Sequence, residues 1–430
     1  MFLNCFFRLS SFQFARFGLL FALFLSTELS GLALFPVLAT LPPNLTTTPA
    51  KPTNTSELDP LNPDLYPPDP LLPLSVPLSP FQRRRLREAL DKLNLEAQAQ
   101  ADAGNQDGAF EIWYRELRAR RTLGALEEIN ALGRVGGVAW EKTRKEDVAR
   151  ITKRLEQVKL EQQGDASLTP EILAALAKAY QKMRSLDEAI AIYQQMRVNA
   201  KSQKNVKAEE QSLNILGELY LAKFDYTNAA IIYEDLLARS QARKNAYWEG
   251  IYLQKLAEIY SKSSEPSNAI RIKEQLVKRH IKDQKIELIP DLKIALGEDY
   301  EALNQPEKAS QNYQEAYSLS WSLQQFGAAG LALKKLANLY QVNNQPSFAL
   351  QIYQKLLRIE QQSYNYYGLM KTYEQVAQLY RTAKQYQPAL MAYQQSLALA
   401  RSLKYQEQED YLLNQIQLVN SEMQNKVPIK

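Results

Sequence analysis

The sequence of 430 residues predicts an all-α fold, a solenoid in which about eight antiparallel helix pairs stack on one another. Similar segments recur at intervals of 40 residues between about Leu86 and Met423, which is typical of a stacked repeat architecture. Within each copy the apolar residues follow two helical stripes, separated by a short polar break. Because one helix pair cannot bury its apolar face alone, neighbouring pairs must stack.

The first helix of each copy carries a tyrosine at the same position. In LKKLANLYQV the apolar residues fall at i, i+3, i+4 and i+7, which is one stripe of an amphipathic helix. A small residue precedes each tyrosine by three positions, and we expect it to let the two helices of a pair approach closely. The tyrosines are Tyr180, Tyr220, Tyr260, Tyr300, Tyr340 and Tyr380, and the small residues are Ala177, Gly217, Ala257, Gly297, Ala337 and Ala377.

The second helix of each copy carries an alanine and, four residues later, another tyrosine. In the breaks, Asn304 and Asn344 fit the left-handed conformation that ends a helix, while Pro306 and Pro346 fit the first turn of the next helix. We expect the two sets of tyrosines to fill the space between units. The alanines are Ala189, Ala229, Ala269, Ala309, Ala349 and Ala389, and the tyrosines are Tyr193, Tyr233, Tyr313, Tyr353 and Tyr393, with Lys273 as the exception.

The two copies at the amino end follow the pattern more weakly. Trp140 and Ala149 continue the first tyrosine and alanine positions, and Ala109 and Trp113 continue the positions of the second helix. We therefore assign degenerate repeats to residues 81–163 and six well-formed repeats to residues 164–405. A capping helix and tail are predicted for residues 406–430.

The repeat resembles the tetratricopeptide repeat family. The family's Leu-Gly-x-x-Tyr and Ala-x-x-x-Phe/Tyr motifs match LGELY with Ala229 and Tyr233, and LGEDY with Ala309 and Tyr313. The period of 40 residues departs from the family's usual period of about 34. The resemblance implies a right-handed superhelical solenoid of antiparallel helix pairs that binds partners in its concave groove.

Charge and cysteine content exclude some classes of function. The net charge of +5 is small and evenly spread, whereas nucleic-acid binding requires a basic face or stripe. Cys5 is the only cysteine, so the chain forms no internal disulfide. A body without cysteine is compatible with an oxidising compartment.

The amino end predicts a signal peptide or membrane anchor over residues 1–39. The apolar residues 17–39 follow Arg8 and Arg16 and end in small residues, which is the pattern of a secretory signal. They also provide about the 20 residues that a membrane span needs. Glu28 and Pro36 favour cleavage over retention. We expect a protein that is exported to a periplasm or lumen, or anchored in a membrane through residues 17–39.

Residues 40–80 contain twelve prolines and predict a linker. Such a segment favours extended conformations and acts as a semi-rigid spacer, or binds a proline-recognising groove of a partner. Composition favours the simplest interpretation, a disordered linker.

Little in the sequence indicates catalysis. His280 is the only histidine, and it occupies a position late in a second helix where other copies carry Ser240, Ser320 and Glu360. We interpret it as a solvent-facing structural residue. The sequence contains no zinc-ligand spacing, phosphate-binding loop or nucleophile–base set. We therefore predict a protein that is not an enzyme and has no cofactor and no metal site.

The first helices carry the candidate binding residues. In the resembled family, the position two residues after the conserved leucine faces the groove, and here it holds Lys178, Glu218, Glu258, Glu298, Asn338 and Gln378. The three glutamates, with Glu301, would form an acidic stripe that recognises a basic segment or weakly binds a divalent cation. The alternative is that each glutamate is solvated and paired with a lysine of its own helix.

Lys334 and Asn338 also match the spacing of the first repeat of the family's carboxylate clamp. Gln375 stands where the next repeat of the clamp has asparagine, so we interpret the match as coincidence. The leading prediction is a non-catalytic scaffold or assembly factor that binds protein partners, such as a subunit of a membrane complex, and no nucleic acid.

The Asn-Gln-Pro turns and glutamine-rich helices also resemble those of cyanobacterial exported or membrane-tethered repeat proteins, several of which assist photosystem assembly. Two alternatives remain open. One is a divalent-metal delivery or assembly factor for a membrane complex such as a photosystem, acting through the acidic stripe. The other is the regulatory subunit of an enzyme.

Overall fold

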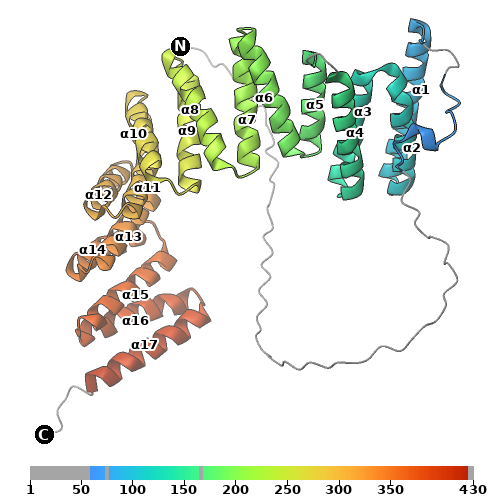
Figure 1. Cartoon of the computed structure of the whole chain (residues 1–430). Helices are drawn as coiled ribbons and strands as arrows, with labels where there is room; N and C mark the ends of the chain where they lie inside the picture. Colours follow the sequence, from blue (N-terminus) through green and yellow to red (C-terminus); the bar gives the residue numbers. More distant parts are fainter. Residues whose placement is uncertain (1–58, 73–76, 164–167, 425–430) are drawn as a thin grey trace, which may run out of the picture. The chain divides into compact units, whose positions relative to one another are not determined.

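The computed structural model describes residues 59–72, 77–163 and 168–424, which contain α-helices, short 3-10 helices and no strand. The chain divides into one unit over residues 1–57 and a second over residues 58–430, and the described residues belong to the second. The predicted signal peptide or anchor, residues 1–39, and the linker up to residue 58 lie outside them. Consecutive helices run antiparallel and form the predicted pairs (Figure 1).

Eight helix pairs and one final helix make up the described part of the chain. Every helix from α7 to α10 and from α12 to α16 is 17 residues long. The first four pairs are α1 (Pro80–Asp102) with α2 (Gln106–Arg120), α3 (Ala125–Glu141) with α4 (Lys145–Gln163), α5 (Pro170–Lys182) with α6 (Leu186–Ser202), and α7 (Val206–Ala222) with α8 (Tyr226–Ala242). The next four are α9 (Ala246–Lys262) with α10 (Pro266–Lys282), α11 (Ile289–Ala302) with α12 (Pro306–Ser322), α13 (Phe326–Val342) with α14 (Pro346–Gln362), and α15 (Tyr366–Thr382) with α16 (Tyr386–Ser402), followed by α17 (Gln406–Gln424).

Short turns with one left-handed residue separate the helices. Asn304 and Asn344 both have φ of 54°, and Pro306 and Pro346 begin the next helix, as predicted. From Arg184 to Lys404 a residue with positive φ recurs every 20 residues, so each helix and its turn form one unit of constant length. This regularity produces the 40-residue period of the helix pair.

The predicted tyrosine and alanine positions form the contacts within and between pairs. All six alanines of the second helices are fully buried. A Cβ atom added at Gly217 would lie 2.8 Å from the ring of Tyr233, which confirms that a small residue is needed there. The hydroxyl of Tyr260 donates to Glu234 of the preceding pair at 2.9 Å, and Tyr300 repeats this contact with Glu274 at 3.0 Å. The tyrosines of the first helices therefore join neighbouring pairs.

The amino-terminal pairs depart from the pattern at α3 and α4. Ala109 and Trp113 are buried as predicted, but the prediction for Trp140 and Ala149 is wrong, because both are exposed. Instead α3 packs directly on α5, and a Cβ atom at Gly133 would lie only 2.7 Å from the Cβ of Ala179. This close approach of the two backbones changes which face of α3 is buried.

Residues 59–72 pack on α2, which differs from the disordered linker that composition favours. Leu61 is 2% exposed and belongs to the core that α2 and α3 share. Arg115 donates to both carboxylate oxygens of Asp69, at 2.6 and 3.1 Å, and the guanidinium of Arg118 lies 3.7 Å from the ring centre of Tyr66. We call residues 59–72 the proline-rich strap.

The final helix α17 covers the last pair. It packs on α16 and buries Leu412 and Val419, which would otherwise leave the apolar side of that pair in water. Arg381 of α15 forms an ion pair with Glu422 of α17 at 2.6 Å. The helix therefore supplies the polar outer layer that the end of a stacked array requires.

Candidate binding face on the first helices

The odd-numbered helices from α1 to α17 share one polar, exposed surface, which we call the first-helix face. Glu218, Glu258, Glu298, Lys334 and Asn338 all lie on it and are exposed. Ion pairs join neighbouring first helices across this surface: Glu218 of α7 with Lys255 of α9 at 3.0 Å, and Glu298 of α11 with Lys335 of α13 at 2.5 Å. Two of the predicted groove residues, Glu218 and Glu298, therefore each link one first helix to the next.

The predicted acidic stripe is neutralised by lysines. Glu258 pairs with Lys262 at 2.6 Å within α9, while Glu218 and Glu298 pair with lysines of the following pair. Partial burial opposes ionisation of Glu218, but hydrogen bonds from Tyr233 and Lys255 outweigh it and lower the pKa of Glu218. Glu301 accepts a hydrogen bond from Tyr313. These glutamates position buried tyrosines and link neighbouring repeats.

No metal centre forms from these side chains. Within residues 59–72, 77–163 and 168–424, histidine, cysteine and acidic side chains nowhere gather in groups of three suited to a metal ion. The glutamates are also committed to lysine and tyrosine partners, which would compete with a cation for their oxygens.

Four pockets on the first-helix face share one construction. Each is lined by two or three neighbouring first helices and by the second helix that packs between them, which we call its floor. Their volumes are about 300, 650, 270 and 560 Å³. The floor residue recurs in register: it is Arg120 on α2, Ala200 on α6, Ser240 on α8 and Glu360 on α14. The repeat thus produces the same pocket several times with a different chemical group beneath it.

Lys334 and Asn338 line the pocket above Glu360. Asn338 accepts a hydrogen bond of 2.9 Å from the hydroxyl of Tyr353, and Gln375 lines the opposite side on α15. Glu360 is 8% exposed, and burial raises the pKa of its carboxyl group, opposed by a hydrogen bond from Asn365 and by the charge of Lys334. This pocket therefore combines a buried carboxyl group with a lysine at its rim.

His280 occupies the floor position in its own repeat. It is 7% exposed, so the prediction of a solvent-facing histidine is wrong. Its Nδ1 atom is buried and finds no hydrogen-bond partner among the described residues. Burial, followed by the charge of Lys285, lowers the pKa of His280. The sequence offered a signal for this position, because His280 aligns with Ser240, Ser320 and Glu360, which are also buried.

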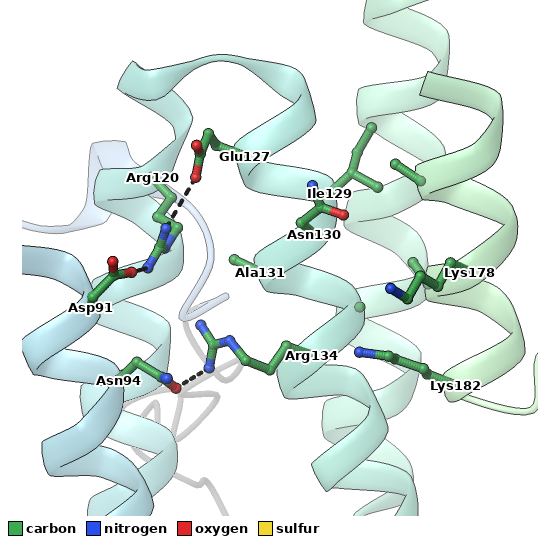
Figure 2. Close-up of a pocket in the computed structure, with 13 residues that line it drawn as sticks. Asp91, Asn94, Arg120, Glu127, Ile129, Asn130, Ala131, Arg134, Lys178 and Lys182 are labelled. Atoms are coloured by element: carbon green, nitrogen blue, oxygen red, sulfur yellow. Dashed lines mark hydrogen bonds and ion pairs between the residues drawn. The ribbon is translucent and has the colours of Figure 1, made fainter. Parts of the chain in front are cut away.

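The pocket above Arg120 is the most highly charged (Figure 2). Arg120 forms ion pairs with Asp91, Glu116 and Glu127. Arg134 of α3 reaches across to Asn94 of α1 and also pairs with the fully buried Glu116 at 2.6 Å. Lys178 and Lys182 of α5 complete the lining.

None of the described helices is long and apolar enough to cross a membrane. The apolar residues 17–39, on which the prediction of an anchor rests, lie outside the described part of the chain.

Comparison with known proteins places these repeats in a family. Models of the tetratricopeptide repeat match residues 172–203, which form the third pair, and residues 328–402, which form the seventh and eighth pairs. No curated protein matches the chain.

Several solved structures are similar to parts of the chain. BtubC (BKLC) from P. vanneervenii is 18% identical, with 51% of this chain and 92% of that chain covered and a TM-score of 0.36. A putative kinesin light chain from Podosopora anserina with nearly identical TPR-like repeats is 18% identical, with 45% and 95% covered and a TM-score of 0.36. Yeast Tom70 is 14% identical, with 81% and 62% covered and a TM-score of 0.33. The family matches show tetratricopeptide repeats in residues 172–203 and 328–402, and the helix pairs around them repeat with the same 40-residue period.

Proposed function

We propose that this chain is a non-catalytic scaffold that binds an extended segment of a protein partner along its first-helix face. The observation that carries the proposal is the series of pockets with floors at Arg120, Ala200, Ser240 and Glu360. An extended chain has side chains at regular intervals, so it can place successive residues in pockets that recur in register.

The varied floors favour selective binding. Exposed residues between the pockets form ion pairs with one another and give little net charge. The floors and rims of the pockets must therefore distinguish one partner sequence from another. A buried floor group that is left unpaired by the wrong partner costs more than a solvated surface contact contributes. One surface of constant geometry can therefore distinguish partner sequences.

We further propose that residues 17–39 direct export to a periplasm or lumen, or anchor the chain in a membrane. The support is the sequence of this segment: two arginines, an apolar run and a small-residue end. A scaffold placed there would assemble proteins at or beyond the membrane. Mass spectrometry of the amino terminus of the native protein tests this part, since removal of residues 1–39 and their retention give different masses.

Site-directed photo-crosslinking tests the binding face. A photoreactive amino acid replaces Glu258 or Asn338 on first helices. The control positions are Lys201 and Lys355 on second helices. All four residues are exposed. Irradiation in the native membrane fraction should give discrete adducts from the first pair of positions and not from the second. Equal adducts from both pairs, or adducts from the second helices alone, would contradict the proposal.

A further inference from the structure

We propose that the part of the first-helix face running from α3 across α5 to α7 binds a partner segment in which acidic side chains lie next to a large apolar side chain. This inference rests on the proposed function and names the partner chemistry for one part of the face. It concerns two adjoining pockets, one above Arg120 and one above Ala200, which have α5 as their common wall.

The acidic side chains would bind at Lys178 and Lys182. These two residues are exposed and lie one helical turn apart on α5. Figure 2 shows their side chains pointing from α5 toward α3, into the pocket whose other walls are α1 and α3. Within the described residues neither lysine forms a hydrogen bond or an ion pair. Their charges are therefore available to a ligand.

The charge of this pocket is positive because its carboxylates are already engaged. Asp91, Glu116 and Glu127 all pair with arginines, and three arginines, Arg87, Arg120 and Arg134, surround them. Three arginines and two lysines against three carboxylates leave two positive charges in excess, which corresponds to the two lysines.

The repeat itself explains why Lys178 has no partner among the described residues. In two other repeats the equivalent residues, Glu218 and Glu298, pair with lysines that follow them by 37 residues on the next first helix. The residue that follows Lys178 by 37 positions is Ile215, which cannot neutralise an ammonium group. A carboxylate of the bound partner would therefore supply the opposite charge that Ile215 does not provide.

Close packing fixes the positions of these lysines. Gly133 lets α3 approach the backbone of α5 at Ala179, and a Cβ atom at Gly137 would lie 3.4 Å from the Cβ of Lys182. The helix that carries both lysines is therefore held against α3 before any ligand binds. Preorganisation of this kind reduces the entropy that binding must overcome.

The apolar side chain would enter the pocket on the other side of α5. This pocket has a volume of about 650 Å³, and Leu173, Met196 and Ile215 contribute apolar side chains to its lining. Ala174, one turn before Lys178 on α5, forms part of its rim. A segment that crosses α5 therefore meets the apolar pocket and the lysines in succession.

Trp248 gives the apolar pocket an exposed aromatic wall. Its side chain stacks on Tyr252 with ring centres 5.6 Å apart, yet Trp248 remains 42% exposed and lines the pocket from α9. Exposed aromatic residues at the edge of a pocket are common anchors in protein interfaces. Side chains of leucine or phenylalanine size would cover this ring and bury the apolar lining.

Fluorescence anisotropy with short labelled peptides tests the inference. The parent peptide carries three glutamates next to a Leu-Phe pair, with an acetylated amino end and an amidated carboxyl end. One companion replaces the glutamates with glutamine, and another replaces Leu-Phe with two serines. A third companion is the glutamine peptide with a free carboxyl end, which separates side-chain carboxylates from a terminal one.

The full chain in detergent should bind the parent peptide, and the affinity should fall as salt is added. The glutamine companion, or the double variant Lys178→Glu with Lys182→Glu, should weaken binding by at least about tenfold. The matched control is Lys153→Glu with Lys201→Glu, which changes the same charge at exposed residues of α4 and α6 and should leave affinity within about twofold. Trp248→Ser should weaken binding of the parent peptide but not of the serine companion.

Besides a complete absence of peptide binding, three results would overturn the inference. The first is an equal loss of affinity for the parent peptide in the two double variants. The second is binding of the peptide with a free carboxyl end and of no other peptide. The third is tighter binding of a short single-stranded RNA than of the parent peptide. Circular dichroism of each variant shows whether it is folded. If no peptide binds while crosslinks still form at Glu258 and Asn338, the inference fails and the proposed function stands.

Discussion

The ammonium group of Lys273 on α10 lies 2.7 Å from the carboxylate of Asp299 on α11, and both side chains are largely buried. Lys273 stands where other repeats have a tyrosine, and Asp299 stands where they have Leu219, Ile259 or Leu339. Burial raises the pKa of Asp299, and the hydrogen bond from Lys273 offsets part of this effect. Two departures from the repeat therefore compensate each other in a single ion pair.

Replacing Lys273 with tyrosine alone should destabilise the protein. The tyrosine restores the common residue of the second helices but leaves the Asp299 carboxylate buried without its cation, which costs about 3 kcal/mol. Guanidinium unfolding followed by circular dichroism measures the free energy of unfolding. The double variant Lys273→Tyr with Asp299→Leu should recover at least the stability of the native chain, because replacing both members of a buried pair with apolar groups is often neutral or stabilising.

The exposed lysine Lys355 provides the control for this comparison. Lys355→Tyr lies on the outer side of α14 and should change the free energy of unfolding by less than about 0.5 kcal/mol. A Lys273→Tyr chain as stable as the double variant would show that the pair is not coupled.

Replacing Gly133 with alanine should separate α3 from α5. The added Cβ atom would lie 2.7 Å from the Cβ and 2.8 Å from the Cα of Ala179, and the backbone atom cannot move without shifting the whole helix. We expect a loss of about 2 kcal/mol, the usual scale for overpacking in a dense core. Thermal unfolding measures it.

The matched control is Gly327→Ala, since a Cβ atom at Gly327 meets nothing within 4 Å. Alanine there should stabilise α13 by up to about 1 kcal/mol through helix propensity alone. If both alanine variants had the same stability, close packing at Gly133 would not explain the unusual contact between α3 and α5.

The sequence was sufficient to predict the helix pairs, their interval, and the buried alanines and tyrosines. These features repeat, so each copy supports the others. Trp140 was misplaced because the packing of α3 depends on Gly133 and Ala179, a contact between helices that no local pattern records. The order of the proline-rich strap was missed for a similar reason, since Asp69 and Arg115 are far apart in the sequence.

The binding face was only partly predictable. The position of Glu218 on the exposed side of α7 was implied by the resemblance to the tetratricopeptide repeat. The ion pair of Glu218 with Lys255 could not be predicted, because contacts between neighbouring first helices depend on how the helix pairs stack. The pockets were missed because their floors lie on second helices, although their walls lie on first helices.

His280 should make the protein less stable in weak acid. Its native pKa is lowered, by burial first and then by Lys285 and Arg279, against the opposing charges of Asp283 and Glu287. The unfolded chain therefore binds a proton more readily than the native chain. The free energy of unfolding should be unaffected above the unfolded pKa of about 6.5 and should fall as the pH drops below it.

The variant His280→Ser tests this effect, because serine occupies the same position at Ser240 and Ser320. Guanidinium unfolding of both chains at a series of pH values measures the free energy of unfolding. The native chain should lose more stability than the variant between about pH 7 and pH 5, a range in which ordinary carboxyl groups remain ionised. Parallel curves for the two chains would rule out His280 as the source.

The proline-rich strap should be released by Asp69→Asn. The side chain of Asp69 accepts two hydrogen bonds from Arg115 and one of 2.9 Å from the backbone of Leu71, so the substitution removes an ion pair and weakens a local turn. Amides of residues 61–72 should exchange faster in hydrogen–deuterium exchange mass spectrometry, while the unfolding free energy changes by less than about 1 kcal/mol because the ion pair is partly exposed. The control Asp64→Asn lies in the same strap. Asp64 forms no ion pair with another described residue, so this variant should leave exchange unchanged. Equal exchange in the two variants would mean that the contacts of Leu61 and Tyr66 hold the strap on α2 without the Asp69 ion pair.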